Sequence, residues 1–163
     1  MNLDKLKEPY VIILIGPPLS GKTTWINKNF EPGTFELISR DQIVMDVHGD
    51  EDYNTAFKSV DQKEVDRILV GKLSQAGKEG KNAIVDMTHM NSKRRKFNLS
   101  FFGEDYYKLA VIFPILKDEE YVLRDKKRTE EENKSIPMHV IKNMISSYQP
   151  VNKIEGFDKV ISL

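Results

Sequence analysis

Hydrophobic residues gather in short continuous runs that alternate with longer amphipathic stretches. The strongest run, Tyr10–Ile15, is apolar at every position, rich in β-branched residues, and stops at Gly16. A strand that is apolar on both faces is typical of the middle of a sheet that is covered on both sides. We expect four further strands, at residues 35–39, 82–86, 107–113 and 160–163.

Helical periodicity occupies the segments between these strands. Val65, Leu69 and Leu73 recur at the spacing of one helix face and support a helical stretch over about residues 54–77. Further helices are expected from about Lys22, over about residues 91–101, and in two lid-like segments within about residues 118–149. Strands that alternate with helices of this length imply parallel crossovers. The predicted fold class is therefore α/β, a doubly wound parallel sheet of about five strands with flanking helices and a helical lid.

Length and composition narrow the possible classes of protein. The 163 residues show no internal repeat and no long linker, so we expect a single domain over residues 1–163. With 25 basic and 25 acidic residues the net charge is zero, so any contact with nucleic acid has to be local. The absence of cysteine excludes disulfides and a cysteine nucleophile and favours a cytoplasmic setting. No apolar run approaches membrane-spanning length, so no membrane partner is expected.

A glycine-rich loop follows the first predicted strand directly and precedes the first predicted helix. It fits G-x-x-x-x-G-K-[ST], and these residues are expected to hold a nucleotide: Gly16, Pro17, Pro18, Leu19, Ser20, Gly21, Lys22, Thr23 and Thr24. In such a loop backbone N–H groups and a helix N-terminus converge on an anion, and Lys22 adds a mobile charge at the β- and γ-phosphates. The Thr23 hydroxyl is expected to bind Mg²⁺. ATP and Mg²⁺ are therefore the predicted cofactors.

Acidic residues follow the second and third predicted strands, at the edge where doubly wound sheets bind their ligands. Asp41 is a candidate to accept the proton of an attacking hydroxyl, and its alternative role is an N-cap of a helix that begins at Gln42. Asp86 is a candidate to hold Mg²⁺ or a Mg²⁺-bound water, and its alternative role is a turn cap.

Four segments together resemble the kinase domain of phage-type 5′-polynucleotide kinases, within the wider group of small P-loop kinases. They are the loop at residues 16–25, Ser-Arg-Asp at 39–41, Asp-Met-Thr-His-Met-Asn-Ser-Lys-Arg-Arg at 86–95, and a stretch from Arg124 through Arg128 to Ile136-Pro137, Met144 and Tyr148. These segments cover nearly the whole chain in the expected order. The resemblance implies a P-loop kinase that transfers the ATP γ-phosphoryl group to the 5′-hydroxyl of a DNA or RNA end in nucleic-acid repair.

The resemblance also implies roles for individual residues. Asp41 corresponds to the general base that activates the 5′-hydroxyl. Lys22 and Arg128 are expected to stabilise the transferring phosphoryl group, and Arg124 is expected to contact the nucleotide. The two arginines lie four residues apart, on one face of a helix, where both can close over a triphosphate. Val44 departs from the pattern, because the family commonly has an arginine there that grips the phosphate of the acceptor.

Residues around the second and third predicted strands are expected to bind the acceptor: Arg40, Thr88, His89, Arg94 and Arg95. The basic run at 93–96 would contact a polynucleotide backbone, and its alternative is an ordinary solvated helix face. Asp86 stands two residues before Thr88, whereas the phage form has its aspartate immediately before the threonine, and we treat the two as equivalent.

Two other functions remain open at the level of sequence. One is a P-loop kinase for a small-molecule or other non-nucleic-acid hydroxyl, which the zero net charge and Val44 favour. The other is a catalytically silent nucleotide- or RNA-binding module. The retention of Lys22, Thr23, Asp41 and both lid arginines argues against it. Phage polynucleotide kinases also carry a phosphatase domain, which these 163 residues are not expected to contain. The oligomeric state stays open.

Overall fold

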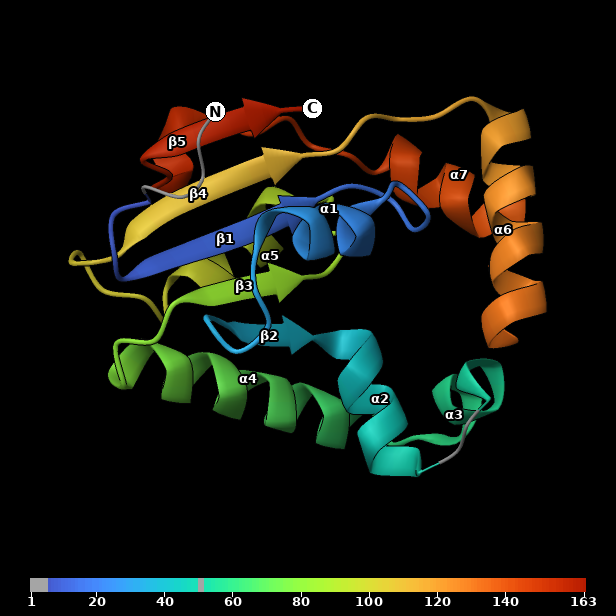
Figure 1. Cartoon of the computed structure of the whole chain (residues 1–163), viewed down its shortest axis with the longest axis horizontal. Coiled ribbons are helices and arrows are strands. Elements are labelled where there is room, and N and C mark those ends of the chain that lie inside the picture. The colour runs from blue at the N-terminus through green and yellow to red at the C-terminus, as the bar shows by residue number, and fades with distance from the viewer. Residues whose placement is uncertain (1–5, 50–51) are drawn as a thin grey trace.

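The computed structural model describes residues 6–49 and 52–163. Its centre is one parallel sheet of five strands in the order β2-β3-β1-β4-β5, with β1 in the middle (Figure 1). The strands are β1 Tyr10–Ile15, β2 Glu36–Ser39, β3 Ala83–Asp86, β4 Tyr107–Ile112 and β5 Lys159–Ser162. The predicted doubly wound α/β sheet of about five strands is confirmed, and each strand end differs from the prediction by no more than one residue.

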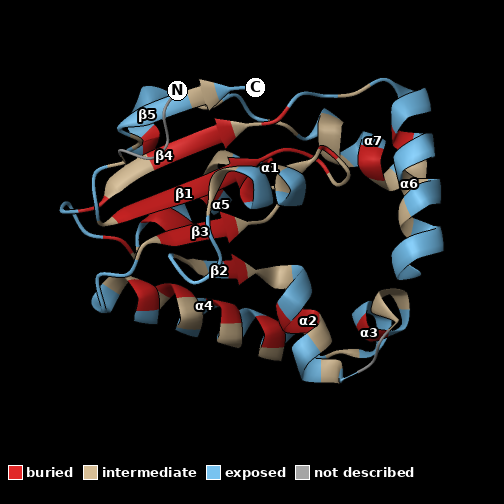
Figure 2. Cartoon of the chain, in the orientation of Figure 1, coloured by how far each residue is buried: buried red, intermediate tan, exposed pale blue. Residues whose placement is uncertain are grey.

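All six residues of β1 are buried, because helices cover both faces of the sheet (Figure 2). Alternate β1 side chains enter two separate hydrophobic clusters, as the period of two along a strand requires. Val11, Ile13 and Ile15 pack with side chains of α2, α4 and α5. Ile12 and Leu14 pack with α1 on the opposite face.

The helices connect these strands as parallel crossovers require. They are α1 Lys22–Asn29, α2 Arg40–His48, α3 Tyr53–Ser59, α4 Gln62–Lys78, α5 Ser92–Leu99, α6 Asp118–Glu132 and α7 Met138–Ser146, with a short 3₁₀ helix η2 at Lys153–Glu155. Gly77 lets α4 approach the segment that follows α5, since a Cβ there would lie 1.9 Å from the Phe101 carbonyl oxygen.

The helical stretch expected over residues 54–77 is in fact two helices. Val60 has an extended backbone (φ −74°, ψ 144°) and ends α3. Asp61 then begins α4 as its N-cap, accepting a hydrogen bond from the Lys63 N–H. The apolar spacing continues across this break, so periodicity alone merged the two helices. As a result α3 is free to turn toward the carboxyl ends of the strands.

The predicted lid corresponds to α6 and α7, which lie beyond the carboxyl ends of the strands (Figure 1). Tyr121 is the buried anchor of α6, and its hydroxyl accepts a hydrogen bond from the Leu116 N–H at 3.0 Å. Asp125 pins the connection to α7 by accepting hydrogen bonds from the Ser135 hydroxyl at 2.7 Å and the Ile136 N–H at 2.9 Å. The lid and α3 therefore both face the edge at which the sheet would bind ligands.

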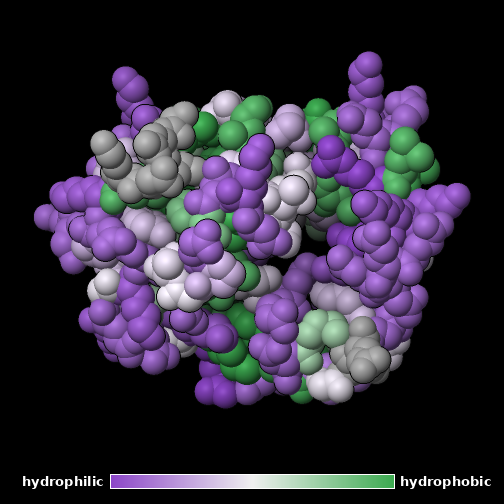
Figure 3. Space-filling model, in the orientation of Figure 1, coloured by the Kyte–Doolittle hydropathy of each residue, from purple (hydrophilic) through white to green (hydrophobic). Residues whose placement is uncertain are grey.

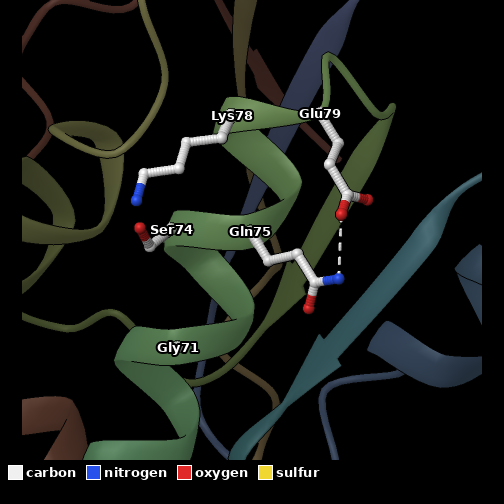
Figure 4. A pocket seen from close by; sticks show the side chains of 5 residues that line it. All are labelled: Gly71, Ser74, Gln75, Lys78 and Glu79. Carbon is white, nitrogen blue, oxygen red and sulfur yellow. Dashed lines mark hydrogen bonds between the residues drawn. The ribbon is translucent and has the colours of Figure 1, made fainter.

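The face of the molecule shown in Figure 3 is mostly hydrophilic, and it is hollowed between the lid and the part that contains the sheet. A second, shallow hollow lies on α4 at its end away from the lid, where Gln75 donates a hydrogen bond to Glu79 (Figure 4). That hollow is formed by Gly71, Ser74 and neighbouring residues of one segment and contains none of the expected site residues. Within residues 6–49 and 52–163, no helix combines the length and apolar composition needed to cross a bilayer.

Candidate active site

The glycine-rich loop connects β1 to α1 through backbone conformations that its glycines permit. A Cβ on Gly16 would lie 2.8 Å from Cβ of Phe113 and 2.9 Å from the Ser20 hydroxyl oxygen, so only glycine fits there. Gly21 has φ 97° in the left-handed region and caps α1. Leu19 also adopts a positive φ of 64°. The loop is thereby folded back on itself at the N-terminus of α1.

Lys22 places its ammonium inside this loop. Its Nζ donates hydrogen bonds to the carbonyl oxygens of Gly16 at 3.1 Å and Pro17 at 2.8 Å. Burial lowers the pKa of Lys22, which the carboxylates of Asp86 and Asp41 partly oppose. The Ser20 hydroxyl is buried and has no hydrogen-bond partner in the described part of the chain. Because a buried polar atom without a partner is costly, these groups suit an anionic ligand that would satisfy them.

The other residues that were predicted to hold a nucleotide lie in the same loop and in the first turn of α1. Pro18 and Leu19 are half-buried, whereas Thr23 and Thr24 are exposed in the first turn of α1. The N–H groups of a first helical turn have no intrahelical acceptors and attract anions. The structure therefore brings together all the residues that the motif predicted to hold a nucleotide.

Asp86 ends β3 next to the loop, as expected from its position after a buried strand. Its carboxylate lies close enough to Lys22 for the two charges to interact, yet burial dominates and raises the pKa of Asp86. Among the described residues, its side chain makes no hydrogen bond to a backbone N–H, so it does not cap a turn. A half-buried carboxylate beside such a loop is suited to a cation.

Asp41 is not the N-cap of α2. Ser39 takes that role, with its hydroxyl accepting from the Gln42 N–H. The Asp41 carboxylate instead accepts hydrogen bonds from the Tyr53 hydroxyl at 2.7 Å and from Lys134 Nζ at 2.6 Å. Partial desolvation by neighbouring groups alone would raise its pKa, but the Lys134 charge and both hydrogen bonds outweigh this and lower the pKa of Asp41.

The two lid arginines make different contacts. Arg124 donates a hydrogen bond to the Leu19 carbonyl oxygen at 2.9 Å, which ties the lid to the glycine-rich loop. Arg128 donates to the Lys134 carbonyl oxygen at 3.3 Å and forms an ion pair with Asp125 at 3.5 Å. Its charge also acts on Lys22, so it lies near the loop. Arg124 therefore contacts the loop directly, and Arg128 is held within the lid at a distance over which its charge still acts on Lys22.

The expected acceptor residues divide into those near the site and those used elsewhere. The Thr88 carbonyl oxygen accepts a hydrogen bond from the Gly16 N–H at 3.0 Å, which joins the segment after β3 to the loop. Arg40 turns toward α4, donating to Gln62 at 2.6 Å and pairing with Asp66 at 3.4 Å. Arg94 is exposed on α5. Val44 is fully buried in the core, so its position does not face an acceptor.

Two acceptor predictions are wrong, because His89 and Arg95 are interior. His89 Nδ1 lies 2.7 Å from the Leu14 carbonyl oxygen and Nε2 lies 2.8 Å from the Asn98 amide nitrogen, a pair of contacts that suits a neutral ring with hydrogen on Nδ1. Burial lowers the pKa of His89 to about 4. Arg95 is completely buried, and it donates to the His89 carbonyl oxygen at 2.9 Å.

The partner of Arg95 is Glu155, which comes from the 3₁₀ helix η2 near the end of the chain. The pair is bidentate, with contacts of 2.6 Å and 2.8 Å, and both side chains are inaccessible to water. The run at 93–96 is therefore partly structural: Arg95 holds the segment after β3 in place, while its neighbours stay on the surface. The four consecutive basic residues in the sequence do not show which side chain points into the interior.

Tyr53 and Lys134 are residues of the candidate site that the sequence did not single out. Lys134 lies 93 residues from Asp41 along the chain, and its ammonium also stands 3.8 Å from the centre of the Tyr53 ring. Neither residue belongs to a motif, and no local pattern predicts a contact over that separation.

Residues 11–151 of the chain match the AAA domain family, which is well over half of the sequence. The chain belongs to the AAA domain family. The P-loop of this AAA domain is the glycine-rich loop between β1 and α1.

Several solved structures share the fold of this AAA domain. A chain from the PezAT chromosomal toxin-antitoxin system of Streptococcus pneumoniae is 15% identical, with a TM-score of 0.65, over 97% of this chain and 68% of that chain. A gluconokinase from Sinorhizobium meliloti 1021 is 12% identical, with a TM-score of 0.54, over 97% and 83%. A chain of the Pnkp1/Rnl/Hen1 complex is 16% identical, with a TM-score of 0.51, over 94% and 45%. At these identities the likeness concerns the fold alone.

The family and the glycine-rich loop together indicate a nucleotide-binding domain. The loop lies at the carboxyl edge of the parallel sheet, where doubly wound sheets bind their ligands, and the helical lid lies beyond the same edge. The identity of the acceptor is a separate question.

Proposed function

We propose that this AAA domain transfers the γ-phosphoryl group of ATP to the 5′-hydroxyl of a DNA or RNA end. The observation that carries the proposal is the placement of Asp41, whose carboxylate lies at the carboxyl edge of the sheet and within electrostatic range of Lys22. It is also 55% exposed, so an acceptor hydroxyl can reach it from outside. A carboxylate in this position can take the proton that the hydroxyl loses.

The choice of a polynucleotide acceptor rests on the motifs shared with phage-type polynucleotide kinases and on the exposed basic surface of α5. Lys93, Arg94 and Lys96 are all exposed there, beside the segment that follows β3. Separate cations along one helix suit successive backbone phosphates. In this proposal Lys22 and Arg128 neutralise the charge of the transferring group, and Arg124 contacts the nucleotide.

The residues present fit ATP and Mg²⁺. The unpartnered Ser20 hydroxyl and the Lys22 ammonium suit phosphate oxygens. The described part of the chain holds no group of three or more His, Cys, Asp or Glu side chains placed to bind a metal. Mg²⁺ in such sites is held by one or two protein oxygens together with phosphates and water, so Thr23 and Asp86 would hold it. When bound, the ion would neutralise charge on the phosphates.

The decisive experiment incubates the protein with γ-labelled ATP, Mg²⁺ and 5′-hydroxyl oligonucleotides of DNA and of RNA. The test variant is Asp41→Asn, and the matched control is Asp46→Asn, an exposed aspartate on the same helix. We expect label on the 5′ end with the native protein and with Asp46→Asn. In Asp41→Asn the label should fall by about 100-fold or more while ATP affinity stays within a few fold.

The outcome also separates the acceptor classes. ATP binding without labelled oligonucleotide would contradict the proposal. In that case the second candidate is a small-molecule hydroxyl acceptor, which the fold shared with a gluconokinase and the zero net charge favour. Loss of ATP binding in Asp41→Asn would instead make Asp41 a structural residue.

A further inference from the structure

Lys134 occupies a turn that the lid holds firmly. Asn133 ends α6 in the left-handed conformation, with φ 51°, and Lys134 follows it directly. The Lys134 carbonyl oxygen accepts hydrogen bonds from Arg128 Nε at 3.3 Å and from the Thr129 hydroxyl at 3.4 Å. Asp125 binds the next two residues of the turn. The backbone of this lysine is therefore fixed relative to the lid.

The side chain of Lys134 crosses from the lid to the acceptor side. It is only 14% exposed, and its ammonium pairs with Asp41 at 2.6 Å while lying 3.8 Å from the centre of the Tyr53 ring. Tyr53 in turn donates its hydroxyl hydrogen to the other Asp41 oxygen at 2.7 Å. Both carboxylate oxygens are thus held from two different elements, α3 and the lid, which restrains the rotation of the Asp41 side chain.

We propose that Lys134 is a positioning residue of the transfer reaction, which orients the Asp41 carboxylate from the lid and so couples lid placement to the acceptor site. The inference rests on the proposed function, in which Asp41 accepts the proton of the acceptor hydroxyl. Arg128 belongs to the same connected set, because it bonds the Lys134 backbone while its charge acts on Lys22. The lid thereby presents one cation to each side of the site.

The pH dependence follows from the groups that face Asp41. These are Lys134 from the lid, Tyr53 from α3, Lys22 from the loop and Asp86 from β3. Partial desolvation raises the pKa of Asp41, whereas Lys134, the Tyr53 hydrogen bond and Lys22 lower it. Loss of the Lys134 charge therefore raises the pKa of Asp41, so the carboxylate becomes protonated at a higher pH than in the native protein. The acid limb of the pH profile of kcat/KM for the acceptor should therefore also move to higher pH.

The experiment compares Lys134→Met and Lys134→Arg with Lys127→Met, a matched control on the exposed face of α6. Two quantities are measured: the Asp41 carboxyl titration by ¹³C NMR, assigned with Asp41→Asn, and the pH profile of phosphoryl transfer. We expect Lys134→Met to raise the pKa of Asp41, to lower kcat by about 10- to 100-fold, and to leave the KM for ATP within about twofold. Lys134→Arg should recover most of the activity, and Lys127→Met should match the native protein.

Each alternative result has a definite meaning. An unchanged Asp41 titration in Lys134→Met, or equal losses in the Met and Arg variants, overturns the role of Lys134 and leaves the proposed function intact. If the native protein phosphorylates no oligonucleotide but the Asp41 titration still depends on Lys134, the proposed function fails and the positioning contact stands. Should Lys134→Met fold poorly, Tyr53→Phe tests the same carboxylate from α3, with a smaller loss of kcat expected.

Discussion

The two sides of the candidate active site are built in opposite ways. On the nucleotide side, the residues that would surround a phosphate lie within one stretch of nine, and the hydrogen bonds of Lys22 stay inside it, with Gly16 and Pro17. On the acceptor side, Asp41 is held by residues 12 and 93 positions away in sequence. The nucleotide side is formed by a sequence motif, whereas the acceptor side is formed by tertiary contacts between distant residues.

This difference has a chemical consequence. A loop that folds on itself can bind phosphate in many proteins, because its backbone N–H groups and helix N-terminus need no distant partner. An acceptor site assembled from separate elements can change its substrate by single substitutions while the sheet stays unaltered. Lys134 connects the sides, since the turn that carries it also accepts the Arg128 hydrogen bond.

The largest expected effect comes from the nucleotide side. Lys22→Met removes the only ammonium that lies inside the described loop, so kcat should fall by about 100- to 1000-fold with every acceptor tested. ATP affinity should fall as well, because the same charge contacts the phosphates before transfer. Single-turnover kinetics and ATP titration measure the two losses.

The control for Lys22→Met is Lys28→Met, in the last turn of α1, which is exposed and lies away from the loop. Its activity should stay at the native level. If Lys22→Met kept its activity with one acceptor and lost it with another, the separation of the two sides would be disproved.

Substitution of Arg128, which belongs to the lid between the nucleotide side and the acceptor side, should have a smaller effect than substitution of Lys22. Arg128→Ala should lower kcat by about 10- to 100-fold and change the KM for ATP by no more than about threefold, because its charge is needed most in the transition state. Steady-state kinetics with ATP as the varied substrate separate the two parameters. An effect confined to KM would assign Arg128 to ground-state nucleotide binding.

The structure also shows why sequence succeeded on one side and failed on the other. The continuous apolar run of β1, the loop and the order of the strands are local features, and the fold predicted from them is confirmed. The break between α3 and α4 was missed because the apolar spacing continues through Val60. Asp61, the N-cap of α4, is a residue type that often begins a helix, but the apolar periodicity outweighed this local signal.

His89 and Arg95 were misassigned for a different reason. A histidine or arginine after a strand at the site edge suggests a ligand contact, yet both side chains point inward. Arg95 is buried only because Glu155, 60 residues later, compensates its charge with a bidentate pair. No spacing in the sequence encodes that pairing, just as none encodes the contact of Lys134 with Asp41.

The smallest expected effect is on the exposed surface of α5. In the double variant Lys93→Gln, Arg94→Gln, we expect a flatter dependence of acceptor KM on salt, with the KM for ATP unchanged. For every phosphate that the variant no longer binds, the slope of log KM against log salt should decrease by about 0.7 for a single strand, or about two- to threefold in KM between 50 and 200 mM. The double variant Lys72→Gln, Lys78→Gln on α4 serves as a control of equal charge. Equal slopes in the native protein and the α5 variant would leave the basic surface as a solvated helix face, and specificity for the acceptor would then rest on the neighbourhood of Asp41 alone.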